Sequence, residues 1–206
     1  MHISEGVLSP AVLYGGAALA CVGLGLGLRK LDYDKLMTVA ILSAAFFVGS
    51  LIHVPIGPAN AHLIVNGLLG LLLGWAAFPS IFVALLLQAV LFQFGGLTVL
   101  GVNTVNMALP AVLAALLCRP LIARGGKARM LGAFLCGALS VAGAGLCTAL
   151  ALALTDEGFV QAAQMLLLAH VPVMVVEGGI TLLTVGFLAK VQPELLHNAL
   201  GGRECA

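Results

Sequence analysis

The chain has 206 residues, of which 62% are hydrophobic and 8% are charged, and its net charge is +1 at pH 7. Soluble domains carry about 25% charged residues, so this composition excludes a water-exposed globular surface. A net charge near zero, without a basic stripe, also gives no indication of nucleic-acid binding. We therefore predict an all-α integral membrane protein.

The amino-terminal residues, MHISEGVLSP, lack the basic and apolar segments of a cleavable signal peptide. We expect Met1 to be retained, because a bulky residue such as His2 disfavours its removal. The Met1 amine, the His2 amide and the His2 imidazole can form two fused chelate rings around one metal ion. Three nearly coplanar nitrogens suit the tetragonal geometry of Ni(II) and Cu(II), and a fourth would complete a square plane. Residues 1–9 are thus predicted to chelate metal, with Glu5 either bonding backbone amides or solvated.

Apolar stretches of bilayer length, about 20 residues each, follow along the chain. About seven transmembrane helices are predicted, at residues 10–28, 36–54, 62–77, 79–95, 105–123, 130–154 and 160–189. The nine basic residues lie between the first two spans, between the fifth and sixth, and after the seventh. By the positive-inside rule the amino terminus is outside, and the tail at residues 190–206 is cytoplasmic. The 206 residues are predicted to form a single transmembrane domain.

Two segments without basic residues, 52–62 and 95–106, are predicted to be outer loops. The first contains VPIGPANA, whose prolines and glycine are typical of a stiff non-helical turn, and His62 follows it. Ionisable residues at membrane depth are functional candidates by default, so we predict that His62 is the fourth nitrogen ligand. The alternative is a headgroup-level histidine without a ligand. His53 and Asn60 are candidates for a ligand on the path into the site, or for hydrogen-bond partners of a ligand.

The second segment contains GGLTVLGVNTVNM, with glycines that allow bending and two asparagines, Asn103 and Asn106. Non-helical backbone at membrane depth persists only when it is buried in protein or lines a cavity. We therefore predict a wall or lid of the site, in which both asparagines serve as hydrogen-bonding residues. Asn66 and Gln88, deeper in the spans, are predicted to be interhelical hydrogen-bonding residues.

His170 and Glu177 are seven residues apart in the last span, which places them on one helical face. Buried ionisable groups need partners, and a buried polar pair, a contact with another subunit and a proton relay all remain open. The cysteines occur singly, without a CxxC spacing, and are predicted to be apolar fillers. No GxxxxGK[ST] string is present, so ATP hydrolysis by this chain is not expected.

Four stretches, MHISEG, VPIGPANAHL, GGLTVLGVNTVNMA and HVPVMVVEGGIT, resemble the NikM/CbiM family across nearly the whole chain. These proteins are the substrate-capture (S) components of energy-coupling-factor ABC transporters for nickel and cobalt. The resemblance implies a multi-pass protein of a prokaryotic cell membrane, with a link to cobalamin biosynthesis. It implies no cofactor, and a transported Ni(II) or Co(II) ion held by the Met1 amine, the His2 amide and imidazole, and a loop histidine that matches His62. His53 is a departure from the family's pattern, and it leaves open an additional ligand on the entry path.

The resemblance also implies partners: a transmembrane coupling (T) subunit, two cytoplasmic ATPase subunits and often a small accessory membrane protein. Nickel and cobalt members share the motifs, and the planar nitrogen set favours nickel. The alternative function is a stand-alone secondary transporter or channel for a divalent metal, with His170 and Glu177 coupling protons. An intramembrane enzyme is disfavoured, because no nucleophile–base set or HExxH string is present.

Overall fold

The computed structural model describes residues 2–32, 36–51, 53–56, 59–63 and 65–201, and within the two strands only the backbone. The helices are α1 (Pro10–Arg29), α2 (Leu36–Gly49), α3 (Asn66–Leu73), α4 (Ala77–Phe92), α5 (Leu100–Ala123), α6 (Gly126–Ala153), α7 (Val160–Val191) and α8 (Pro193–Ala199). Two short 3-10 turns are η2 (Gly74–Ala76) and η3 (Glu157–Phe159). The strands β1 (His53–Ile56) and β2 (Ala59–His62) form one hairpin between α2 and α3. The predicted helical architecture is confirmed, and the hairpin is an additional element.

Among the described residues, five helical stretches are long and apolar enough to cross a membrane. They are Pro10–Arg29, Asn66–Phe92, Leu100–Ala123, Gly126–Ala153 and Glu157–Val191. Large apolar side chains are exposed along several of these helices, for example Leu117 on α5 and Leu183 on α7. Lipid tolerates such a surface, whereas water does not.

Two predicted spans are wrong in extent. The second was expected to run to residue 54, but α2 has 14 residues and ends at Gly49. The third was expected at 62–77, but α3 has only 8 residues. The chain between α2 and α3 forms the hairpin and not a helix, because Pro55 lacks the N–H that a helix interior requires. At the other end, Gly74 has a φ of 56°, which ends α3 and turns the chain into α4.

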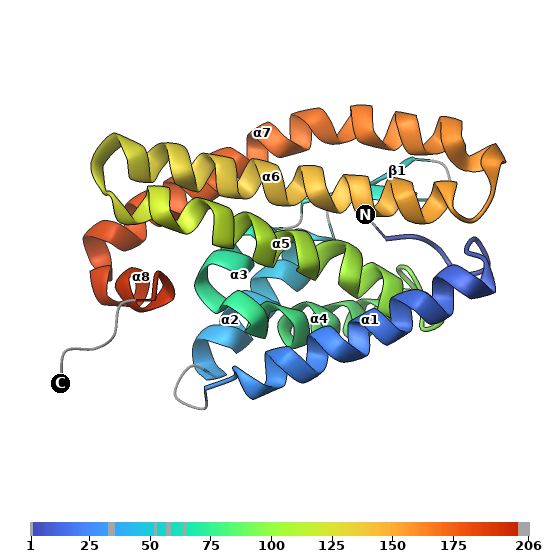
Figure 1. Cartoon of the computed structure of the whole chain (residues 1–206), viewed down its shortest axis with the longest axis horizontal. Helices are drawn as coiled ribbons and strands as arrows, with labels where there is room; N and C mark the ends of the chain where they lie inside the picture. Colours follow the sequence, from blue (N-terminus) through green and yellow to red (C-terminus); the bar gives the residue numbers. More distant parts are fainter. Residues whose placement is uncertain (1, 33–35, 52, 57–58, 64, 202–206) are drawn as a thin grey trace.

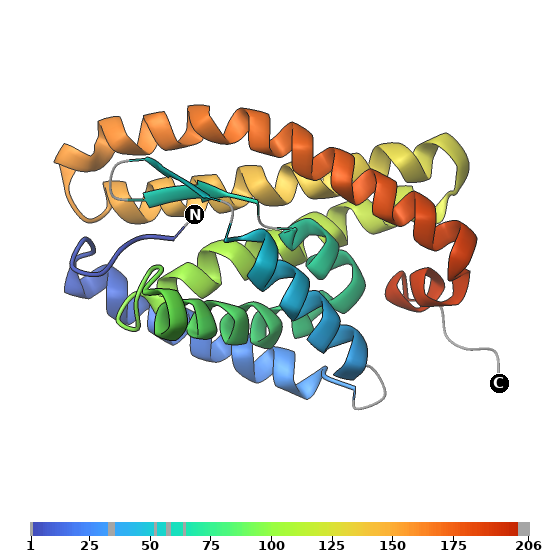
Figure 2. The same cartoon turned by 180° about the vertical axis from the view of Figure 1, so that it is seen from behind.

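The long helices α1, α5, α6 and α7 run along the long axis of the molecule, and α6 lies between α5 and α7 (Figure 1). The segment before α1 does not continue outward from that helix. It runs back toward the middle of the molecule and lies beside the β1–β2 hairpin in both views (Figures 1 and 2). Two segments far apart in the sequence are thereby brought together.

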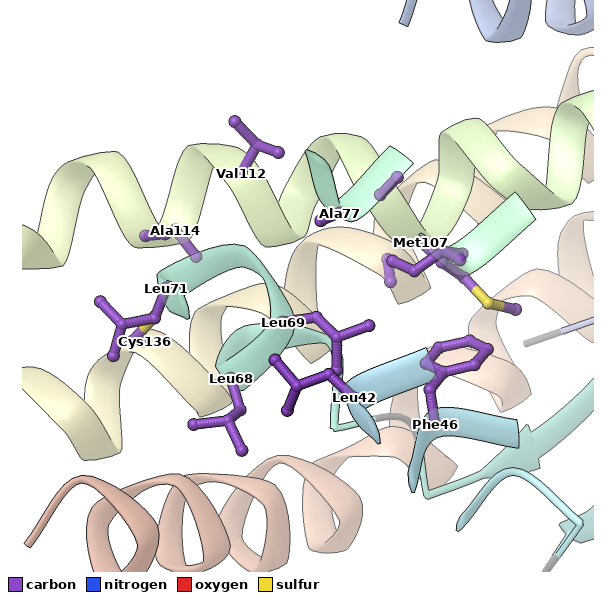
Figure 3. Close-up of a cluster of buried hydrophobic side chains, with 14 of the residues drawn as sticks. Leu42, Phe46, Leu68, Leu69, Leu71, Ala77, Met107, Val112, Ala114 and Cys136 are labelled. Atoms are coloured by element: carbon purple, nitrogen blue, oxygen red, sulfur yellow. The ribbon is translucent and has the colours of Figure 1, made fainter. Parts of the chain in front are cut away.

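The main apolar core surrounds the short helix α3, as Figure 3 shows with Leu68, Leu69 and Leu71 among side chains of α2 and α5. Helix α3 lies unusually close to its neighbours. A Cβ on Gly70 would lie 2.1 Å from the Ala111 carbonyl oxygen, and one on Gly67 would lie 2.8 Å from the Gly137 Cα. Glycine is therefore required at both contacts, and the close packing fixes the helix into which the hairpin leads.

Candidate metal-binding site

Asn103 on α5 binds the backbone of the residue that follows His2. The Ile3 N–H donates to Asn103 Oδ1 at 3.0 Å, and Asn103 Nδ2 donates to the Ile3 carbonyl oxygen at 3.1 Å. The carboxamide thus makes the pair of bonds that a neighbouring strand would make. Asn103 is 2% exposed and Ile3 is fully buried, so these bonds are shielded from water. His2 is therefore attached to a fixed backbone.

Glu5 fixes the same segment two residues further on. Its N–H donates to the Gly95 carbonyl oxygen at 3.1 Å, and its carboxylate accepts from the Thr98 N–H at 3.0 Å and the Thr98 hydroxyl at 3.3 Å. The backbone bond from Thr98 is the main reason that the pKa of Glu5 lies below its ordinary value of 4.5. Of the two alternatives for Glu5, the structure shows the one in which it bonds a backbone amide.

Residues 95–99, here called the glycine turn, approach this segment closely at Gly95 and Gly96, where an added Cβ would be crowded. Gly96 has a φ of 136°, and a Cβ there would lie 1.9 Å from Glu5 Cγ. Gly95 has a φ of 76°, and a Cβ there would lie 3.4 Å from Cδ2 of the buried His2. The sequence indicated bending at these glycines but did not indicate this close approach. Thr98 was also missed, because a threonine in a turn has no distinctive pattern.

The predicted outer loop at 95–106 is shorter than expected, because α5 begins at Leu100. Asn103 and Asn106 consequently lie on a helix, one turn apart, and both are buried. Asn106 Nδ2 donates to Thr148 Oγ1 on α6 at 3.5 Å, whereas Asn103 bonds the amino-terminal segment. The i, i+3 spacing of the two asparagines was the helical signal that the glycines obscured.

The hairpin carries the candidate residues His53, Asn60 and His62 at defined backbone positions. Its antiparallel register pairs His53 with His62, Val54 with Ala61, Pro55 with Asn60 and Ile56 with Ala59. His53 and His62 are thus cross-strand neighbours, next to the junctions with α2 and α3. The side chains of the strands, and all of Met1, lie outside the described residues. What the structure brings together is the clamped backbone after His2 and the strand that ends in His62 (Figure 2).

His170 and Glu177 are both fully buried on α7, but they have separate partners. His170 Nδ1 lies 2.6 Å from the Leu166 carbonyl oxygen, and among the described residues its Nε2 has no hydrogen-bond partner. Both carboxylate oxygens of Glu177 accept the Val65 N–H, at 2.8 and 3.0 Å. Among the described residues, no hydrogen bond joins His170 to Glu177, whose Cα atoms lie about 10 Å apart along the helix.

The predicted roles of Asn66 and Gln88 as interhelical hydrogen-bonding residues are confirmed. Asn66 Nδ2 donates to the Met107 and Ser140 carbonyl oxygens at 3.2 and 3.5 Å. Gln88 Nε2 donates to the Phe47 carbonyl oxygen at 3.1 Å and contacts the Ser50 hydroxyl. Both side chains are fully buried and connect different helices.

Comparison with known proteins gives matches over nearly the whole chain. The sequence profile of CbiM, described as the cobalt uptake substrate-specific transmembrane region, matches residues 2–195. The chain is 43% identical over 203 residues to a metal transport protein of Haemophilus influenzae, covering 96% of this chain and 98% of that protein. It is 33% identical to the cobalt transport protein CbiM of Kyrpidia tusciae, covering 97% of this chain and 87% of that protein.

Two solved structures are also similar. A crystal structure of a transition metal transporter has a TM-score of 0.80 at 32% identity, covering 96% of this chain and 97% of the other. A crystal structure of a truncated transition metal transporter has a TM-score of 0.76 at 30% identity, covering 92% of this chain and 99% of the other. The similarity thus extends to the three-dimensional arrangement of almost every described helix.

Proposed function

The chain belongs to the CbiM family of cobalt uptake substrate-specific transmembrane proteins, and from this we propose that it captures nickel or cobalt ions for an ATP-driven importer. It is a multi-pass membrane protein and a transport component, not an enzyme. In this proposal the ion is the cargo, and it is held at the outer face until the partner subunits release it inward.

The observation that carries the proposal is the clamping of the segment that follows His2. Asn103 binds both backbone groups of Ile3, and Glu5 is bonded to the glycine turn. A chain terminus is ordinarily mobile, because little holds its backbone. Here His2 and Ile3 are buried, and the segment lies beside the hairpin that carries His62, as a chelate made from the first two residues requires (Figure 2).

The proposed ligand set is the Met1 amine, the His2 amide and imidazole, and the His62 imidazole. These nitrogens would form a square plane, which suits Ni(II) and leaves Co(II) as the nearest alternative cargo. Binding requires loss of a proton from the His2 amide and from any charged amine or imidazole, so affinity should fall as the pH falls. The buried setting of His2 would exclude competing water ligands.

The energy for uphill transport would come from partners, because this chain has no phosphate-binding loop. We propose a transmembrane coupling subunit and two cytoplasmic ATPase subunits, with the amino terminus outside and the tail cytoplasmic. A small accessory membrane protein is a further candidate, since relatives in Rhodobacter capsulatus and Lactiplantibacillus plantarum are fused nickel transport proteins, NikMN and LarMN. This chain covers only 35% of each of those longer proteins.

A stand-alone proton-coupled transporter is less well supported. That alternative used His170 and Glu177 as a coupled pair, and the structure gives them separate partners. It would require metal uptake, driven by a proton gradient, into vesicles that contain this chain alone.

The first test is titration of nickel and of cobalt into the purified chain with a free Met1 amine. The comparison variant carries Gly-Ser before Met1, which removes the amine from the chelate. A two-residue extension is needed because a single added residue would place histidine third and create a new four-nitrogen chelate. The matched control is His197→Ala, which removes an exposed histidine of α8.

We expect one ion per chain in the native protein and in His197→Ala, and no stoichiometric binding in the extended protein or in His62→Ala. Unchanged binding by the extended protein would overturn the proposed site. The preferred ion would identify the cargo.

A further inference from the structure

The β1–β2 hairpin is attached to the helices at two roots, and both are held by buried polar side chains. At the first root, Gln88 on α4 binds the Phe47 carbonyl and the Ser50 hydroxyl, just before β1. At the second root, Glu177 on α7 binds the Val65 N–H, just after β2. The two roots also lie close together, since a Cβ on Gly49 would lie 3.6 Å from Val65 Cγ2.

Val65, which precedes the first residue of α3, has an unusual backbone conformation. It has a φ of 52° and a ψ of 17°, a left-handed conformation that is unfavourable for a β-branched side chain. It is also the N-cap of α3, where backbone N–H groups lack an acceptor within the helix. Glu177 supplies that acceptor with both carboxylate oxygens, so a contact from outside α3 holds this strained junction in place.

Glu177 is itself rigidly positioned. A Cβ on Gly137 would lie 2.6 Å from the Glu177 carbonyl oxygen, and one on Gly178 would lie 2.8 Å from the Phe134 ring. Helices α6 and α7 are therefore in close backbone contact at this point. Glu177 is fully buried, and an ionisable side chain at such a position in a membrane protein is costly to maintain. If this position served only for packing, an apolar residue would fill it without the desolvation penalty of a buried carboxyl group.

The junction lies only three residues after His62, which ends β2. Three residues span about 10 Å at most, so a change in the direction of the chain at Val65 moves His62 directly. Metal–ligand distances tolerate only about 0.2 Å of error. Small displacements at this root would therefore weaken the fourth metal–nitrogen bond.

We propose that Glu177 is a positioning residue for metal capture. By accepting the Val65 N–H it holds the end of β2 at the place where His62 completes the metal site, and so it sets metal affinity. This inference rests on the proposed function and extends it to a residue on a different helix, 112 residues from Val65.

The test is Glu177→Gln in the full chain with a free Met1 amine, titrated with nickel and followed by the visible absorption of the bound ion. Glutamine keeps the shape of glutamate but offers one oxygen acceptor instead of two, and no charge. The matched control is Thr181→Val, one turn further along α7. Thr181 is also fully buried, and among the described residues its hydroxyl has no hydrogen-bond partner.

We expect Glu177→Gln to weaken nickel binding by about 10- to 100-fold, the range typical of residues that orient metal ligands. The visible absorption of its bound nickel should also differ from that of the wild type, because a displaced His62 would be a weaker fourth ligand. Thr181→Val should bind nickel like the wild type.

Wild-type affinity and spectrum in Glu177→Gln would overturn the inference, as would an equal loss of nickel affinity in Thr181→Val. If Glu177→Gln does not fold, Glu177→Asp is the second variant. It keeps the charge on a shorter side chain, and it should weaken nickel binding measurably, but by less than is expected for Glu177→Gln. Wild-type binding by His62→Ala would instead refute the proposed site itself. The failure of each proposal is thus distinguishable.

Discussion

The amino-terminal segment and the β1–β2 hairpin lie side by side but are held in different ways (Figure 2). The segment is clamped along its length: Ile3 by Asn103, Glu5 by Thr98, and Ile3 and Leu8 by burial in a small apolar cluster. The hairpin pairs its own strands and is anchored at its two roots. Apart from a β-bridge at Ile3, the segment has no regular secondary structure, so its buried backbone groups need partners from other elements, whereas the hairpin pairs its own strands.

Within the amino-terminal segment, the largest effect is expected where the segment has least space. Gly96→Ala would place a Cβ 1.9 Å from Glu5 Cγ, at a φ of 136° that alanine adopts only with strain. The backbone strain costs about 1–3 kcal/mol, and the Glu5 side chain must leave the Thr98 N–H to make room, so nickel affinity should fall by about 100-fold. The control is Gly15→Ala on α1, where nothing lies within 4 Å of an added Cβ. Equal nickel binding by the two variants would show that the segment is not clamped.

The next prediction concerns the side-chain carboxamide of Asn103, which binds the segment at Ile3. Asn103→Ala removes both bonds to the Ile3 backbone and leaves those buried groups unpaired, at a cost of about 1–3 kcal/mol. We expect about tenfold weaker nickel binding. Asn106→Ala, one turn away, removes a bond to Thr148 instead and should lower the unfolding temperature without changing nickel affinity. A similar loss of affinity in both variants would mean that α5 is merely destabilised.

The hairpin should respond differently at its two histidines. His53 and His62 are cross-strand neighbours, and metal-bound histidines usually donate their second nitrogen to a nearby group. We expect His53→Ala to weaken nickel binding by less than about tenfold, whereas His62→Ala abolishes stoichiometric binding. Isothermal titration would separate these cases. If His53→Ala has the larger effect, the fourth ligand is at position 53.

The smallest effect is a pH dependence that belongs to the segment alone. The pKa of Glu5 is lowered by the Thr98 N–H, so its stabilising contribution is complete above pH 4.5 and is lost as the pH falls through the lower pKa of the folded state. We expect the unfolding temperature of the metal-free protein to fall more between about pH 5 and pH 3 in the wild type than in Glu5→Gln. Glu5 is exposed, so the difference should be small. Identical pH profiles would show that the carboxylate contributes nothing.

The long helices were predictable, because a single apolar run of about 20 residues can pair all its backbone N–H and C=O groups in lipid only by forming a helix. α1, α6 and α7 begin and end within a few residues of their expected bounds. The failures are local and have physical causes. The hairpin takes the last residues of the predicted second span, Gly74 ends α3 inside the predicted third span, and the glycine turn concealed the first turns of α5. Hydropathy measures apolar content, and it does not register which backbone groups can be paired.

The sequence by itself determined that the chain is a membrane protein and that nitrogen donors are present at His2, His53 and His62. Composition and residue chemistry are properties of single positions, so they can be read without a fold. Only the tertiary structure decided that Asn103 holds Ile3, 100 residues away, and that Glu177 holds Val65, 112 residues away. Such pairs form because the amino-terminal segment packs against α5 and the chain around β2 packs against α7, and no local pattern in the chain encodes that proximity.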